Sequence, residues 1–269
     1  MSAAHGSGQM GARPLGTGAP ARPASWLAKA LALTLNELRL AVRRGESLLI
    51  TFVIPAGVLL VFSAFDMSGG TATGKPVDRM LPGSMSLAVI AAAMVSLAIA
   101  TGFERSYGVI KRLGGSPAGT SALVASKTAA VVVVEAVQMV LLVLLATGLG
   151  WVPGAGSSLV LVATGLVLGT VAFAGFGLLM AGTLRAEATL ALANLLFLLA
   201  LVLGGIVLPL DKLPATLAAA SSLLPPAALT HVLAIGLGGA LGDATESVVV
   251  LAFWAVVLAG LAARKFRWD

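Results

Sequence analysis

Long apolar stretches separated by short polar segments make up most of this chain. A membrane-spanning helix needs about 20 predominantly apolar residues. Six stretches approach or exceed that length: residues 48–65, 81–103, 123–149, 159–184, 188–208 and 248–263. Inside lipid, backbone polar groups are satisfied only in helices or closed barrels, and apolar runs this long are typical of helices. The pattern therefore predicts an all-α membrane protein with six transmembrane helices.

Residues 25–44 follow a helical period instead of a continuous apolar run. The period separates an apolar face from a polar face: Leu27, Leu31, Leu35, Leu38 and Val42 against Lys29, Asn36, Arg39 and Arg43. A basic amphipathic helix of this kind lies in the membrane interface; packing against a soluble partner is the alternative. Residues 1–24 are rich in Gly, Ala, Pro and Ser and predict a disordered cytoplasmic tail. Residues 25–269 then form a single transmembrane domain.

Composition supports this class, because hydrophobic residues make up 58% of the 269 residues and charged residues only 10%. Soluble domains contain about 25% charged residues. The abundant Ala, Gly, Leu and Val indicate a GC-rich bacterial genome, which predicts a location in the bacterial plasma membrane. The chain has no cysteine, so we expect neither disulfides nor a thiolate metal site.

Basic residues are unevenly distributed between the two sides of the predicted spans. With the N-terminus inside, only Lys75, Arg79 and Lys212 of the 17 Lys and Arg residues fall outside. Because cytoplasmic loops carry the excess of Lys and Arg, we expect both termini to be cytoplasmic. Topology and contact with anionic lipid then account for the net charge of +6, and no nucleic-acid partner is expected.

Two nucleotide-binding patterns lack the structural context they require. Residues 69–75 spell G-x-x-x-x-G-K, but Pro76 stands where Ser or Thr would hold Mg²⁺. Residues 6–11 match G-x-G-x-x-G without a preceding strand. The Asp residues are scattered, and the two His residues lie at opposite ends of the chain. We expect no cofactor, metal site or catalytic residue in this polypeptide.

A charged segment at residues 104–117 separates the second and third spans. A short helix there would carry an apolar edge of Val109, Ile110 and Leu113 beside the basic residues Arg105, Lys111 and Arg112. Such an edge is suited to a partner's groove. Gly114, Gly115 and Pro117 would end the helix. The alternative is an ordinary basic loop on the cytoplasmic side.

Prolines interrupt the apolar sequence between the fifth and sixth spans. They break any straight helix, and the stretches between them are too short to cross a membrane: Pro209, Pro214, Pro225 and Pro226. Such pieces persist in lipid only when they are buried in protein or line a cavity.

Three residues inside predicted spans are candidates for a translocation path or a dimer contact: Glu135 and Gln138 in the third, and Asn194 in the fifth. A charged residue at the centre of a span costs roughly 2.5–3.5 kcal/mol on insertion scales, so Glu135 requires a reason. One interpretation is a translocation path or a dimer contact; the other is a protonated acid that ties helices together by hydrogen bonds. Gly165 and Gly169 form a G-x-x-x-G pair, which indicates close helix packing.

The charged segment resembles the corresponding segment of ABC-2 type permeases, especially the daunorubicin-resistance-like drug exporters. The resemblance rests on Glu104-Arg105, Gly108, the run from Ile110 to Leu113, Pro117 and the following Lys127. It extends from about residue 26 to the end and includes 204–206, 208–210, 213–214, 224–225 and the basic-aromatic ending 264–268. The chain departs from the family at Pro226-Ala227, where relatives more often continue with a polar residue.

The resemblance implies a cytoplasmic coupling helix between spans two and three that binds a groove of an ATPase. The coupling residues it implies are Glu104, Arg105, Gly108, Ile110, Lys111, Arg112, Leu113 and Pro117. It also implies two short re-entrant helices between spans five and six, with an external gate at Pro209, Pro214, Pro225 and Pro226.

As a member of this family, the chain would be the permease subunit of an ATP-driven exporter. It would pair with a second permease, identical or different, and with ABC ATPase subunits that bind the ATP and Mg²⁺. The few charges in the spans favour a hydrophobic or amphiphilic substrate such as a drug, an antibiotic or a lipid-like metabolite. The alternative is a non-transporting membrane scaffold or assembly factor. A channel is a further option, but no filter sequence supports it.

Overall fold

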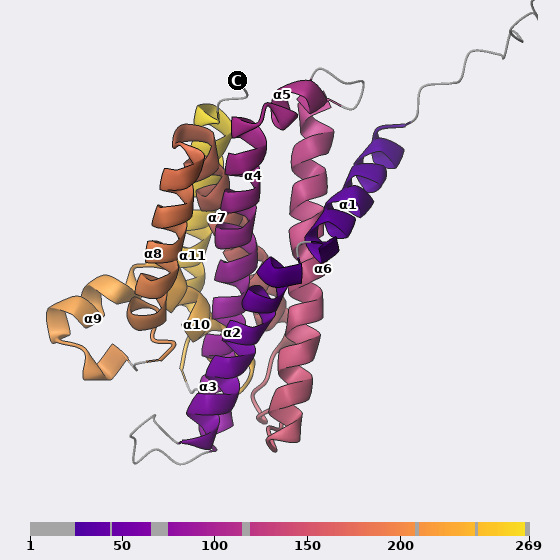
Figure 1. The fold of residues 1–269 in the computed structure, drawn as a ribbon. Helices are drawn as coiled ribbons and strands as arrows, with labels where there is room; N and C mark the ends of the chain where they lie inside the picture. The colour runs from indigo at the N-terminus through magenta and orange to yellow at the C-terminus, as the bar shows by residue number, and fades with distance from the viewer. Residues whose placement is uncertain are drawn as a thin grey trace, which may run out of the picture.

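The computed structural model describes residues 25–43, 45–65, 75–114, 119–207, 210–239 and 242–266, and every regular element in these ranges is a helix (Figure 1). In chain order they are α1 (Trp26–Arg43), α2 (Gly45–Ala64), α3 (Pro76–Val89), the π-helix η1 (Ile90–Ser96), α4 (Leu97–Ser106), α5 (Val109–Gly114), α6 (Gly119–Gly148), α7 (Leu159–Thr183), α8 (Ala186–Leu203), the short 3₁₀-helix η2 (Leu210–Lys212), α9 (Ala215–Ser222), α10 (Pro225–Gly236) and α11 (Thr245–Lys265). The predicted all-α class is confirmed. The predicted tail at residues 1–24 lies outside the described residues.

Five helical segments of the described chain are long and apolar enough to cross a membrane: 76–106, 122–148, 159–183, 186–203 and 245–265. They overlap the second to sixth predicted spans. The first predicted span coincides with α2, whose 20 residues rise about 30 Å, close to the thickness of the hydrocarbon core. Helix α8 ends at Leu203, before the predicted end at 208, because the chain turns at Gly204 and at Gly205, whose φ is 65°.

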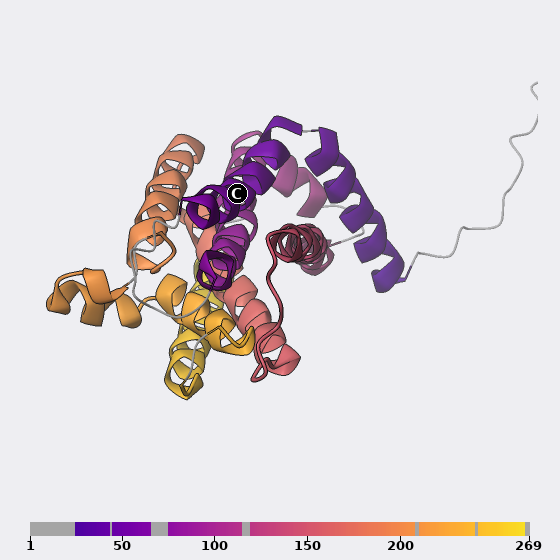
Figure 2. The same cartoon turned by 90° about the horizontal axis from the view of Figure 1, so that it is seen from below.

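The long helices run alternately up and down in one bundle, and the view from below shows them packed around α3 and α4 (Figures 1 and 2). Helix α5 and the last residues of α11 lie at the same end of the bundle (Figure 1). The loop after the second predicted span and the C-terminal end of α11 therefore lie at the same end of the bundle, as the predicted topology requires.

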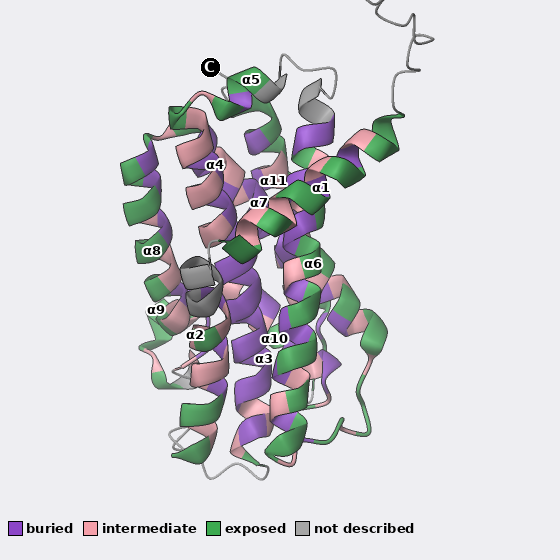
Figure 3. Ribbon diagram, turned by 45° about the vertical axis from the view of Figure 1, so that its right-hand side comes forward, coloured by how far each residue is buried: buried purple, intermediate pink, exposed green. Residues whose placement is uncertain are grey.

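The second predicted span forms the centre of the bundle. Helices α3, η1 and α4 continue one another, and most residues of this segment are buried (Figure 3). Helix α7 approaches it through Gly177, where an added Cβ would lie 2.8 Å from the Met94 carbonyl oxygen. No side chain fits that gap, so glycine lets the two backbones meet. The π-helical segment therefore lies against α7 with little space between them.

Two short helices occupy the region between α8 and α11. Helices α9 and α10 meet at an angle of 79°, and α9 projects from the side of the bundle (Figures 1 and 2). Helix α10 packs among α3, α7 and α11. A Cβ added to Gly165 or Gly169 would lie within 3 Å of a side-chain atom of Val232 or Leu229. This confirms that the G-x-x-x-G pair serves close helix packing, here between α7 and α10.

Helix α1 lies on the outside of the bundle beside α6 (Figures 1 and 2). It buries Ala30 and Thr34, whereas most residues of the predicted apolar face stay exposed: Leu27, Leu31, Leu35 and Val42. Leu38 is half-buried. Helices α6, α8 and α11 also present apolar side chains outward, which is the arrangement that a lipid environment stabilises.

Candidate functional site

The end of the bundle that carries α5 presents a small basic and apolar surface. Helix α4 ends at Ser106, and Tyr107 and Gly108 form the turn into α5, with Gly108 at φ 69°. A residue with a side chain rarely adopts that φ, which accounts for glycine there. The outward-facing side chains, which we call the α5 surface, are Tyr107, Val109, Lys111 and Arg112.

Ile110 differs from the sequence-based expectation. We expected Val109, Ile110 and Leu113 to form one edge against a partner, but Ile110 is only 1% exposed. Because α5 packs against α4 and α6, Ile110 anchors the short helix to the bundle. The side chain of Leu113 and the whole of Pro117 lie outside the described residues.

Arg105 also differs from expectation, since we expected its guanidinium to face a partner. It donates instead to two backbone carbonyls of the chain itself, Gly182 O and Leu184 O, each at 2.6 Å. These groups lie at the C-terminus of α7, where carbonyls lack helical partners and the helix dipole favours a cation. Arg105 therefore joins the end of α4 to the end of α7. The C-terminal segment lies against the same point, because a Cβ on Gly182 would be 2.9 Å from Phe266 Cα.

Glu104 belongs to a cluster of three charges that we call the ion triad. Lys127 Nζ, on α6, donates to Glu104 Oε2 at 2.5 Å and to Glu37 Oε1, on α1, at 2.9 Å. Lys127 is 5% exposed, Glu104 12% and Glu37 19%. We expected Glu104 to contact a partner, but its carboxylate faces into the bundle. The triad links α1, α4 and α6 directly beneath α5.

Sequence reasoning missed Glu37, although a signal was present. It is the one acidic residue of α1, on a helix that otherwise carries basic side chains. A lone acid of this kind often marks a pairing position. Its partner lies 90 residues away, and only the packing of α1 against α6 identifies it.

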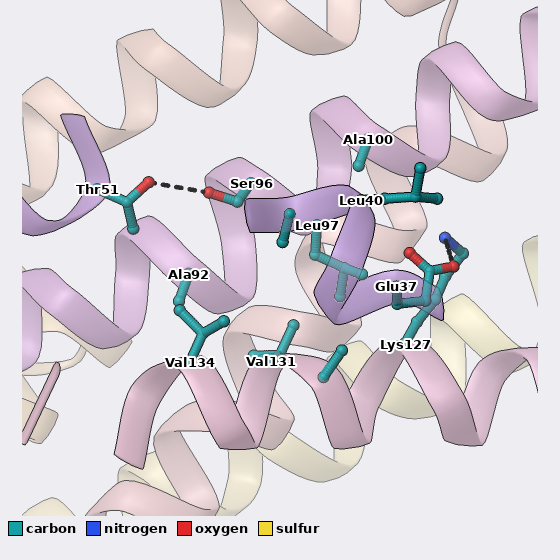
Figure 4. Close-up of a pocket in the computed structure, with 12 residues that line it drawn as sticks. Glu37, Leu40, Thr51, Ala92, Ser96, Leu97, Ala100, Lys127, Val131 and Val134 are labelled. Atoms are coloured by element: carbon teal, nitrogen blue, oxygen red, sulfur yellow. Dashed lines mark hydrogen bonds and ion pairs between the residues drawn. The ribbon is translucent and has the colours of Figure 1, made fainter. Parts of the chain in front are cut away.

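A cavity lies beside the triad, bounded by α1, α2, η1, α4 and α6 (Figure 4). Its volume is about 110 Å³, and Glu37 and Lys127 line one end. Thr51 and Ser96 lie at the other end, with their hydroxyl oxygens 3.3 Å apart. Nothing in the sequence pattern predicted this cavity.

Glu135 and Gln138 point to different neighbours within the bundle. Glu135 Oε2 lies 2.6 Å from Thr170 Oγ1 on α7, and Gln138 Nε2 donates to the Thr51 carbonyl on α2 at 3.1 Å. Both side chains are buried, Glu135 to 6% exposure. Thr170 Oγ1 also donates to Leu166 O. These contacts favour the interpretation in which Glu135 ties helices together.

We expect Glu135→Gln to leave the stability of the bundle nearly unchanged, because the carbonyl oxygen of the amide can still accept from Thr170 Oγ1. Glu135→Ala removes the bond and leaves a gap, and should lower the free energy of unfolding by about 1–3 kcal/mol. Thermal unfolding of the purified chain in detergent measures both variants. Glu187→Ala, at an exposed acid on α8, is the matched control and should have no effect. Equal destabilisation by the Gln and Ala variants would contradict the hydrogen-bonding role.

Asn194 lies on the outer face of α8. Its side chain makes no hydrogen bond to another residue in the part of the chain that the structure describes. A polar side chain on an outward-facing apolar helix is available to a neighbouring transmembrane segment. It is not brought together with Glu135 or Gln138.

The predicted external prolines begin helices. Pro214 caps α9, and Pro225 and Pro226 are the first two residues of α10, positions that need no backbone donor. Pro226 approaches the end of α8, since a Cβ on Gly204 would lie 3.1 Å from its Cβ. Trp254 of α11 donates to the Leu223 carbonyl at 2.9 Å, which fixes the corner between α9 and α10. Pro209 lies outside the described residues.

Comparison with known proteins assigns a family to this geometry. The family model described as ABC-2 type transporter matches residues 29–238, which include helices α2 to α10 and most of α1. No curated protein sequence matches the chain.

Proposed function

Because the chain belongs to the ABC-2 type transporter family, we propose that it is the permease subunit of an ATP-driven exporter for a hydrophobic or amphiphilic substrate. Membership in the family makes the chain a transport subunit that is itself a multi-pass membrane protein. The family implies association with an ABC ATPase. Export, ATP dependence and the nature of the cargo are the parts that we propose. Drugs, antibiotics and lipid-like metabolites are the expected cargo class, as in the drug exporters that the sequence resembles.

The observation that carries this proposal is the α5 surface. Lys111 and Arg112 are exposed on a helix of only six residues, next to the exposed Tyr107 and Val109. A short exposed helix with basic and apolar side chains suits a groove with an acidic rim on a soluble partner. That partner would be the ATPase, which would hold the ATP and Mg²⁺. The end of the bundle that carries α5 and the end of α11 would then face the cytoplasm of a bacterial cell.

The contacts beneath α5 could transmit a movement of the ATPase to the helices of the bundle. Ile110 holds α5 to the bundle, Arg105 links α4 to α7, and the ion triad links α4 and α6 to α1. A force on α5 would therefore reach helices on both sides of α4. Coupling of this kind requires that the ATPase bind two conformations of the permease with different affinity.

A second permease subunit would complete the translocation pathway for the substrate. Asn194, on the outer face of α8, is the proposed dimer contact, because a partner helix would supply its missing hydrogen bonds. The corner between α9 and α10, which lies in the half of the bundle away from α5 (Figure 1), is the proposed external gate and contains Pro225 and Pro226. The gate residues Pro209 and Pro214 belong to the same proposal.

Co-expression with the ATP-binding cassette ATPase encoded nearest to this chain tests the proposal. We expect the two proteins to co-purify and the permease to raise ATP turnover in lipid nanodiscs. An ATPase whose phosphate-binding lysine is replaced should still co-purify but not hydrolyse ATP. A membrane scaffold would leave ATP turnover unchanged, and that result would favour the alternative function.

A further inference from the structure

The cavity beside the ion triad has one charged end and apolar walls. The walls come from Leu40, Leu97, Val131 and Val134, with several alanines between them. A single water needs about 10–15 Å³ of space measured with a water-sized probe. The cavity's 110 Å³ therefore exceeds the space of one water several-fold. It has room for a small polar head with a short piece of apolar body.

The charged end has more negative than positive charge. Glu37 and Glu104 both bind Lys127, so the triad carries a net charge of −1 when all three groups are ionised. Only one oxygen of Glu37 bonds to Lys127, and the Glu37 side chain makes no other hydrogen bond within the described parts of the chain. Glu37 and Lys127 line the cavity, whereas Glu104 is not among its lining residues. An unbalanced charge in a poorly solvated place is costly, and a cation in the cavity would offset it.

Helix α1 has one side on the cavity and the other side exposed. Glu37, Leu40 and Ala41 of α1 form one wall, and the leucine face of the same helix is exposed toward the surroundings. The cavity lies in the half of the bundle nearer α5, between α1 and the long helices (Figures 1 and 4). A ligand in the leaflet on that side would reach the cavity with its apolar body still in lipid.

We infer that this cavity binds an amphiphile with an ammonium head group, which pairs with Glu37 while its apolar body lies along Leu97, Val131 and Val134. The inference rests on the proposed function in one respect, because it specifies the charge of an amphiphilic cargo. Two kinds of molecule carry an ammonium head group on an apolar body: a membrane lipid with a primary amine, and a free amine cargo. Thr51 and Ser96 offer hydroxyl groups at the far end of the cavity.

Direct binding to the chain without any ATPase tests the inference. The probes are radiolabelled dodecylammonium and radiolabelled dodecanol, which share the alkyl chain and differ in charge. Binding to nanodiscs of phosphatidylcholine that contain the chain is measured above binding to empty nanodiscs. We expect saturable binding of dodecylammonium at least about tenfold tighter than that of dodecanol, as for a buried charge-assisted contact.

Two variants separate charge from shape. Glu37→Gln should abolish the preference for dodecylammonium, whereas Glu187→Gln, which removes an exposed acid on α8, should preserve it. Ala100→Leu fills the cavity, leaves the triad intact and should weaken binding of both probes. If Glu37→Gln fails to fold, Ala100→Leu still tests the location. Equal binding of the two probes to the native chain, or unchanged binding by both cavity variants, would overturn the inference.

Nanodisc composition distinguishes the two sources. If an aminolipid occupies the cavity, replacing phosphatidylcholine by phosphatidylethanolamine weakens dodecylammonium binding. If a free amine is the ligand, dodecylammonium binding does not depend on the lipid. Both outcomes support the ammonium site. Failure of the proposed function is a separate result, because it appears as unchanged ATP turnover in the co-expression experiment while probe binding persists.

Discussion

Combined replacement of Lys111 and Arg112 by glutamate should reduce ATP-driven transport at least about tenfold, because like charges at a docking surface cost several kcal/mol. Both side chains are exposed on α5, so the change should not affect folding. Transport and ATP turnover in proteoliposomes, with thermal unfolding of the purified chain, measure the two effects separately. Raised salt should weaken ATPase binding by the native chain, since exposed charges are screened.

The matched control is Arg264→Glu together with Lys265→Glu. These residues are also basic, exposed and at the same end of the bundle, but they lie on α11 and outside the α5 surface (Figure 1). The control should retain most of the transport. Equal losses in the two double variants would mean that the general charge of this end matters and α5 has no special role. Normal transport by the α5 variant would refute docking at this surface.

Of the substitutions proposed, replacing Lys127 by methionine should lower the free energy of unfolding most. It leaves the carboxylates of Glu37 and Glu104 close together without a cation. Breaking a fully buried ion pair costs about 3–5 kcal/mol, and the partial exposure of the two acids reduces the expected cost to about 2–3 kcal/mol. For a chain of this size that corresponds to a fall of about 4–12 °C in the unfolding temperature. Thermal unfolding in detergent measures it.

A compensated variant shows whether the loss comes from charge. Lys127→Met combined with Glu37→Gln and Glu104→Gln has no unpaired charge and should recover most of the stability, because neutral groups can replace a buried ion cluster at little cost. Lys265→Met, at an exposed lysine, should leave the unfolding temperature unchanged. If the triple variant is as unstable as Lys127→Met, packing of the Lys127 stem and not charge explains the result.

The positions of the long helices followed closely from local sequence. Apolar length placed the spans, and the helical period of residues 25–44 agrees with α1 at Trp26–Arg43. These features depend on residues a few positions apart, so a pattern along the chain contains them. The prolines likewise indicated breaks, and Pro214, Pro225 and Pro226 do begin short helices. The α8 boundary was less accurate: the chain turns at Gly204 and Gly205, where Pro226 from a later helix packs against it.

The roles of charged residues did not follow from local sequence. The family resemblance implied that Glu104 and Arg105 are coupling residues, so we expected them to face a partner. The structure turns them inward, Glu104 to Lys127 and Arg105 to the end of α7. A residue's neighbours in sequence set its place on a helix. The neighbouring helix decides whether that place is a surface or a contact.

The sequence by itself determined that this protein is a helical membrane protein with an amphipathic helix before its spans, because hydrophobic length and period are local properties that lipid selects directly. Only the tertiary structure decided which polar groups meet. Glu37 and Lys127 are 90 residues apart, and Glu135 and Thr170 are 35 apart. In an apolar bundle such groups are satisfied by whichever helix packs beside them, so their partners, and the cavity next to the ion triad, exist only once the helices are assembled.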